Sequence, residues 1–224
     1  LTGTWQEAAR VEAAEAARNE WQAFEVVDIV QESSVIKSFY LSPMQEGAVL
    51  PFKAGQFLPV RVPAGEGGRV LTRTYTISSA PLDQSYRISV KRDGLVSGYL
   101  HDQVQVGDMI DVRGPRGRFH INENPERPAL LLAGGVGITP MISMIRQVVQ
   151  DGFRLRKLKP MTLLHVARTS SERAFYADAL ELAKGSQGLV RYASLLTRPA
   201  ENEKQGVDFH GAGRLSADIL GQLL

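Results

Sequence analysis

The sequence predicts an α+β fold in two parts: a six-stranded antiparallel β-barrel, followed by an α/β domain with a parallel sheet. Between residues 21 and 124, short β-branched and aromatic runs alternate with turn residues, which is typical of a barrel. After residue 125, apolar runs alternate with amphipathic segments, as in βαβ units. Pro125 and Pro128 lie where the pattern changes and indicate a domain boundary.

The first part is a succession of short segments rich in Val, Ile, Phe and Tyr, which favour strands. Turn signals at 63–65, 79–81 and 107–108 separate them. Helical spacing of apolar residues predicts one short helix at 96–104. The expected strands are 24–30, 35–41, 56–62, 72–78, 86–92 and 108–113.

The second part, 125–224, alternates strands and helices. Its expected strands are 129–133, 161–167 and 189–196, and its expected helices are 139–150, 171–184 and 217–223. Ser216 is placed to cap the last helix, and 205–213 is expected to be a loop. Ahead of both parts, residues 1–20 are rich in Ala, Glu and Arg and predict an exposed helix at 5–19 or a linker.

Composition excludes several classes of protein. Hydrophobic residues make up 43% and charged residues 22% of the 224 residues, which is ordinary for a globular protein. The net charge of +2, with scattered basic residues, gives no reason to expect nucleic acid. No run approaches the ~20 apolar residues that span a bilayer, so we expect no membrane partner. The absence of Cys fits a cytoplasmic location.

The chain contains no Cys, which excludes disulfides and Cys-ligated iron–sulfur clusters within it. The four histidines lack metal-ligand spacing, so we expect no metal and a surface or packing role for His101, His120, His165 and His210.

The segment Arg73-Thr74-Tyr75-Thr76 indicates a flavin site. Because side chains alternate along a strand, Arg73 and Tyr75 share one face. A guanidinium can bind pyrophosphate oxygens as a fork, and a tyrosine can lie along a flat ring. Thr76 would place a hydroxyl where hydride reaches the flavin. The alternative is a barrel strand with a surface arginine and a packing tyrosine.

A second segment, from Lys91 to Ser97, joins a strand to the short helix. Gly94 permits a tight turn, and Val96 and Ser97 would lie at the helix N-terminus, where backbone N–H groups favour a phosphate. Ser97 could equally be a simple helix cap.

A glycine-rich turn follows the apolar run 129–133. Gly134, Gly135 and Gly137 would let a pyrophosphate approach backbone N–H groups at a helix start. Thr139 would point into the crevice, and Pro140 suits the first helical turn. The spacing is not the G-x-G-x-x-G pattern, and a tight connection without a ligand is the alternative.

Two arginines follow strand 161–167, at the edge where open α/β sheets bind ligands. Arg168 and Arg173 could meet the 2′-phosphate of NADPH, or they could be solvated loop residues.

The order of these motifs resembles the ferredoxin–NADP reductase superfamily, and within it the reductase portion of flavohaemoglobins and related multidomain oxidoreductases. The resemblance runs from about Trp21 to Leu224. Its carriers are Ala54-Gly55-Gln56-Phe57, Arg73–Thr76, Ser89–Arg92, Gly94–His101, Gly114–Phe119 and Gly134–Pro140.

The resemblance implies an NAD(P)H-dependent flavin oxidoreductase. NAD(P)H would give a hydride to FAD, preferred here to FMN, which would pass single electrons to a haem or 2Fe-2S partner in the same parent polypeptide. Tyr75 and Thr76 would be the catalytic residues. FAD would be held by Phe57, Arg73, Thr74, Tyr75, Thr76, Val90, Lys91, Val96 and Ser97, and NAD(P)H by Gly134, Gly135, Gly137, Thr139 and Pro140.

One departure from the family concerns the nicotinamide site. The family carries a later strand, typically with the sequence Cys-Gly-Pro, whereas this chain contains no Cys. We therefore expect a fragment of a longer protein, truncated before that strand. The alternatives are the reductase part of a nitric-oxide dioxygenase and a flavin-binding module without turnover. The nicotinamide donor, NADH or NADPH, stays open, as does the electron acceptor.

Overall fold

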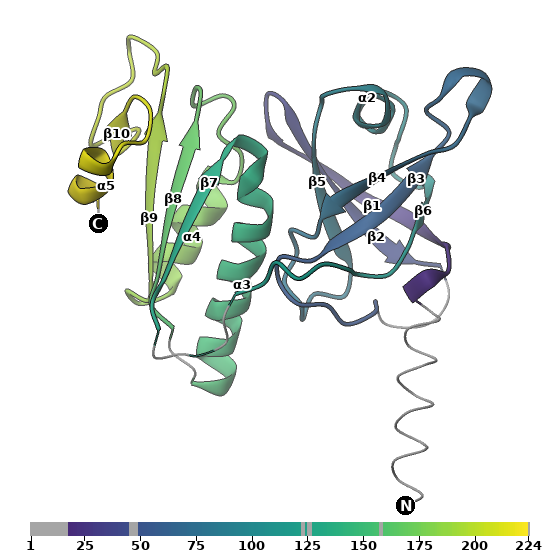
Figure 1. Cartoon of the computed structure of the whole chain (residues 1–224), viewed down its shortest axis with the longest axis horizontal. Coiled ribbons are helices and arrows are strands. Elements are labelled where there is room, and N and C mark those ends of the chain that lie inside the picture. The colour runs from purple at the N-terminus through teal and green to yellow at the C-terminus, as the bar shows by residue number, and fades with distance from the viewer. Residues whose placement is uncertain (1–17, 45–48, 122–123, 125–126, 157–158, 224) are drawn as a thin grey trace, which may run out of the picture.

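The structure is a computed structural model that describes residues 18–44, 49–121, 124, 127–156 and 159–223. A six-stranded antiparallel sheet is followed by a four-stranded parallel sheet with helices, as the sequence predicts. Helix α3 (Ile138–Leu155) lies between the parallel sheet and the barrel (Figure 1). Most of the helix expected at 5–19 falls outside the described residues, and the domain boundaries at 21 and 125 stay predictions.

The first sheet is closed into a barrel. Its strands follow the order β4-β3-β6-β1-β2-β5, and each hydrogen-bonded pair is antiparallel. The two outer strands of this order, β4 and β5, are joined by an antiparallel bridge between Ile77, which directly follows β4, and Ile88 in β5. The elements are β1 (Gln22–Ser33), β2 (Ile36–Pro43), β3 (Phe57–Val62), the 3₁₀ turn η1 (Glu66–Gly68), β4 (Leu71–Thr76), β5 (Tyr86–Lys91), helix α2 (Leu95–Asp102) and β6 (Met109–Val112).

The barrel is filled by the inward-facing side chains that alternate along its strands. Helix α2 covers one end through Val96 and Leu100, which pack into the same apolar cluster. Fully buried members from the strands include Val26, Phe39, Leu58, Val60 and Ile88.

The second sheet has the order β10-β9-β8-β7, with parallel neighbours. Its elements are β7 (Ala129–Gly134), the 3₁₀ turn η2 (Gly135–Gly137), α3, β8 (Met161–Ala167), α4 (Tyr176–Gly185), β9 (Val190–Leu196), β10 (Gly211–Ala212) and α5 (Ala217–Leu223). Helices α3 and α4 cover one face, whereas Ile219 and Leu220 of α5 pack on the other.

Strand β7 lies at the end of this order, and no strand within the described ranges pairs with its outer edge. The further strand that the family resemblance places there stays a prediction. None of the helices described is long and apolar enough to cross a membrane.

Two element predictions were wrong in part. The expected loop at 205–213 contains β10, because Gly211 and Ala212 pair with β9 and continue the sheet. The helix expected from 171 begins only at Tyr176, because Phe175 adopts a left-handed backbone with φ of 59°. This backbone turn separates the helix from the preceding segment.

Helix α3 is longer than predicted. It was expected to end at 150 but continues to Leu155 and stops where Arg156 takes a left-handed φ of 52°. Gly152 lies within its last turns, and a single glycine weakens a helix without ending it.

The barrel and helix α3 meet closely at Gly55. Its φ of +102° lies in a region that side chains rarely adopt. A Cβ added there would lie 2.2 Å from the Phe119 carbonyl oxygen and 2.6 Å from Cε of Met144 on α3. Only glycine therefore allows this approach of the barrel to α3.

Gly55→Ala should destabilise the protein more than Gly107→Ala. Gly107 has a similar φ of +95°, but its added Cβ would meet no atom within 4 Å. Both substitutions strain the backbone, and only the first also overpacks the boundary, so we expect an additional loss of about 1–3 kcal/mol. Urea denaturation of the two variants measures the difference, and equal losses would contradict this packing account.

Candidate cofactor site

The end of β4, the end of β5 and the start of α2 enclose one cavity of about 210 Å³. It is lined by Arg73, Thr74, Tyr75, Lys91, Asp93, Gly94, Leu95, Val96 and Ser97. Six of these residues are predicted flavin ligands, and they come from two separate segments of the sequence, 73–76 and 91–97. The barrel therefore brings the strand motif and the loop motif together.

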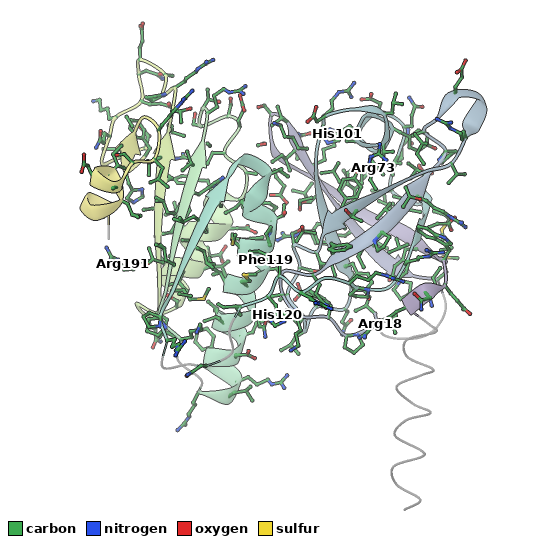
Figure 2. All side chains as sticks on the ribbon, viewed as in Figure 1. Arg18, Arg73, His101, Phe119, His120 and Arg191 are labelled. Atoms are coloured by element: carbon green, nitrogen blue, oxygen red, sulfur yellow. The ribbon has the colours of Figure 1, made fainter. Side chains whose placement is uncertain are left out.

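The charges around this cavity favour an anion. Arg73 and Lys91 contribute two positive charges against the single negative charge of Asp93. Arg73 lies beside α2 (Figure 2), and its Nη1 donates to the Thr72 carbonyl at 2.8 Å. The start of α2 carries no acidic residue in its first turn and no side-chain cap. Its first backbone N–H groups therefore lack intrahelical partners, as a bound phosphate requires.

The loop that leads into α2 has a defined shape. Gly94 precedes the helix with φ of 113°, and an added Cβ would meet no protein atom within 4 Å. The Ser97 hydroxyl accepts a bond from the Asp93 N–H at 2.8 Å and donates to the Gly94 carbonyl at 3.2 Å. Ser97 thus closes the turn from within the helix, and the capping position belongs to Gly94.

Tyr75 and Thr76 occupy the end of β4. Burial raises the pKa of the Tyr75 hydroxyl to about 12, against a smaller effect of the Arg73 charge, so the hydroxyl stays protonated at neutral pH. Thr76 does not line the cavity but lies opposite Phe57 in the β3–β4 pair. Their predicted contacts with flavin stay predictions.

Val90, a predicted flavin ligand, does not line the cavity. Its side chain is fully buried in the apolar core of the barrel rather than along the cavity. Its carbonyl oxygen lies 2.7 Å from Nε2 of His101 on α2. A flavin contact from Val90 therefore stays a prediction that the packing does not favour.

The glycine-rich turn leaves open space around its backbone. Gly134 ends β7, and Gly135 and Gly137 lie in η2, directly before α3. A Cβ added at any of the three would meet no protein atom within 4 Å, and only Gly135 needs a positive φ, of +51°. The glycines are therefore not required by internal packing, and the space beside them can admit a ligand.

The first turn of α3 begins directly after these glycines. Thr139 is buried, and its hydroxyl donates to the Val136 carbonyl at 3.1 Å. This hydrogen bond holds the turn against the start of the helix. Pro140 fits because a first-turn residue needs no backbone N–H bond. Turn η2 also contacts β5, the strand that carries Lys91. The two predicted cofactor sites are therefore neighbours.

The two arginines after β8 lie in different environments. The Arg168 side chain is 59% exposed and lies 3.5 Å from Glu172. Arg173 is buried, and its Nη1 donates to the Ser194 hydroxyl at 2.9 Å and to the Asp208 carbonyl at 2.8 Å. Arg168 is the more accessible of the two to a nucleotide phosphate. Both roles stay predictions.

His165 on β8 was expected only to pack or to face solvent. It is fully buried, and burial lowers its pKa to about 4, against a smaller opposing effect of the Gly135 backbone. Its Nδ1 lies 3.5 Å from the Tyr192 hydroxyl. A neutral imidazole therefore lies behind the glycine-rich turn, and only its position within a buried strand could have indicated this.

Comparison with known proteins agrees with this geometry. Residues 23–121 match the family of oxidoreductase FAD-binding domains, and residues 131–220 match the family of oxidoreductase NAD-binding domains. A flavohemoprotein from Bordetella pertussis is 37% identical over 203 residues, which cover 87% of this chain and 49% of that protein.

Two solved structures are also similar. The flavohem-like FAD/NAD-binding domain of nitric oxide dioxygenase from Vibrio cholerae has a TM-score of 0.77 at 29% identity, covering 88% of this chain and 80% of that one. Phthalate dioxygenase reductase has a TM-score of 0.65 at 28% identity, covering 86% of this chain and 55% of that one.

This chain belongs to the ferredoxin–NADP reductase superfamily. The family resemblance of the six sequence motifs is thereby confirmed. Within the superfamily, the barrel matches the oxidoreductase FAD-binding domains and the parallel sheet matches the oxidoreductase NAD-binding domains. It spans about half the length of the flavohemoprotein that it matches.

The stability of this superfamily member should fall on acidification because of His165. A group whose pKa is lower in the folded protein stabilises the fold above its unfolded pKa and loses that contribution as the pH falls. The pKa of His165 falls from 6.5 to about 4 on folding. Its share of the loss is therefore about 2–3 kcal/mol between about pH 7 and about pH 4.5.

Urea denaturation across this pH range measures the effect. His165→Gln should flatten the pH dependence, whereas His120→Gln, at an exposed position, should leave it unchanged. Identical pH profiles for His165→Gln and the unmodified protein would show that His165 is not responsible.

Proposed function

We propose that the chain binds the FAD pyrophosphate in the cavity of Arg73, Lys91 and Ser97 and binds NAD(P)H at the glycine-rich turn. The observation that carries this proposal is the convergence of two cations and an uncapped helix start on one cavity. The open backbone at Gly134, Gly135 and Gly137 supports the nucleotide site. Together these features suit an NAD(P)H-to-flavin reductase.

Bound FAD would accept a hydride from NAD(P)H and release electrons singly. The residues of this chain bind and orient the cofactor. Arg73 would hold the phosphates as a bidentate fork, and Tyr75 would present a protonated hydroxyl. Thr76 would offer its hydroxyl to the reacting edge of the flavin. No side chain is required to act as a general acid or base.

The acceptor is proposed from the relatives. A flavohemoprotein is among them, and phthalate dioxygenase reductase transfers electrons from pyridine nucleotides to a 2Fe-2S group. We place a haem first, as in the reductase part of a nitric-oxide dioxygenase, with a 2Fe-2S group second. Because the donor is a cellular nucleotide, the proposal includes a cytoplasmic location.

Arg73→Ala should weaken FAD retention. Losing the guanidinium removes a bidentate phosphate contact, so we expect at least about a tenfold rise in the FAD dissociation constant. Arg154→Ala, at an exposed position on α3, is the matched control and should bind FAD normally. Flavin fluorescence titration measures both, and unchanged FAD affinity in Arg73→Ala would exclude the proposed phosphate contact.

Gly137→Ala should weaken NAD(P)H binding without destabilising the fold. Gly137 has an ordinary helical φ of −62°, and its added Cβ would meet no protein atom within 4 Å. The added methyl group would therefore clash only with a bound ligand. We expect a rise of about tenfold in the NAD(P)H dissociation constant. Gly185→Ala on α4, where space is equally open, is the control. Equal NAD(P)H affinity in both variants would refute a nucleotide site at this turn.

A further inference from the structure

Arg87 is a charged side chain that is only 3% exposed, and the proposed reductase chemistry gives it no role. It lies on β5, where Ile88 and Val90 face the barrel core. Its guanidinium donates from Nε to the Ser78 hydroxyl at 3.0 Å and from Nη2 to the Ser78 carbonyl at 2.7 Å. The barrel therefore holds this side chain in one orientation.

A buried chain of hydroxyl groups extends from the same point. The Ser78 and Ser89 hydroxyls are 2.7 Å apart, and so are those of Ser89 and Ser38. Ser38 then donates to the Glu32 carboxylate at 2.5 Å. Burial raises the pKa of Glu32, against smaller effects of Ser38 and of the Arg87 charge. This polar network is built on the outer face of the barrel.

The barrel residues Glu32 and Tyr40 approach Nη1 of Arg87 at 4.0 Å and 3.3 Å, and the second domain supplies further partners. Asp178, in the first turn of α4, places a carboxylate oxygen 3.6 Å from Nη1 of Arg87. The same oxygen lies 2.6 Å from Nη2 of Arg146 on α3. The Phe175 ring, just before α4, lies 4.8 Å from the guanidinium carbon. One carboxylate thus joins a barrel strand to two helices of the NAD-binding domain.

We propose that Arg87 and Asp178 are positioning residues that set the orientation of the NAD-binding domain on the barrel, and with it the approach of nicotinamide to flavin. Helix α3 begins at the glycine-rich turn and carries Arg146. Strand β5 carries Arg87 and also Lys91, which lines the flavin cavity. The contact through Asp178 therefore links the two cofactor sites through rigid elements. The catalytic consequence rests on the proposed function.

Other contacts would keep the domains together without this one. The Ser143 hydroxyl on α3 donates to the Ser79 carbonyl at 2.6 Å, and the Ser34 N–H donates to the Ser171 carbonyl at 2.8 Å. Asp178→Asn keeps the shape of the side chain and removes its charge. We therefore expect this variant to fold but to lose a single domain orientation.

Domain orientation can be measured directly because the chain contains no native Cys. Val27→Cys on β1 and Lys184→Cys on α4, both at exposed positions, would carry a pair of nitroxide labels. The otherwise unmodified protein should give one narrow distance distribution, and Asp178→Asn should give a broader one. Glu181→Gln, exposed on the same helix, is the control and should keep the narrow distribution.

Stopped-flow kinetics on the FAD-loaded protein then test the consequence. Asp178→Asn should lower the limiting rate of flavin reduction by NAD(P)H at least about tenfold, with an unchanged NAD(P)H dissociation constant. Asp178→Glu should restore part of the rate. An unaltered distance distribution in Asp178→Asn would overturn the positioning role, whereas absence of flavin reduction in the unmodified protein would overturn the proposed function alone.

Discussion

The burial of Arg87 constrains how the two halves of this chain meet. A guanidinium removed from water needs acceptors and counter-charges. The barrel supplies hydroxyls and the Glu32 carboxylate at 4.0 Å, whereas α4 supplies the Asp178 carboxylate at 3.6 Å. That requirement aligns α3 and α4 with β5. Because α3 starts at the glycine-rich turn and β5 ends at the flavin cavity, both proposed ligand sites depend on the same boundary.

Much of this architecture could be predicted from the sequence because local patterns agreed with the final fold. Alternating strands, the change of pattern near Pro128 and the glycine-rich turn each report a property of a few neighbouring residues. The cavity was also predictable in outline, since Arg73 lies within β4 and Lys91 ends β5, and the closed barrel brings these two strands together. Features of this kind require little knowledge of distant contacts.

Other features depend on tertiary contacts that no local pattern encodes. Arg87 and Ser89 alternate with apolar residues as on a solvent-facing strand, yet both are buried, and Asp178 and Phe175 of the second domain lie against Arg87. The late start of α4 follows from the left-handed backbone of Phe175, which few side chains adopt and which the sequence does not signal. Arg173 was predicted as a phosphate ligand, but burial and its bond to Ser194 became visible only in three dimensions.

The most direct measurement of the central claim is anaerobic titration of the FAD-loaded protein with NADH and, separately, with NADPH. The two proposed sites are neighbours through the contact of η2 with β5, so one of the nucleotides should reduce the flavin. We predict loss of the oxidised flavin absorbance with one nucleotide consumed per flavin. Protein that binds FAD and retains its oxidised spectrum with both nucleotides would contradict the account.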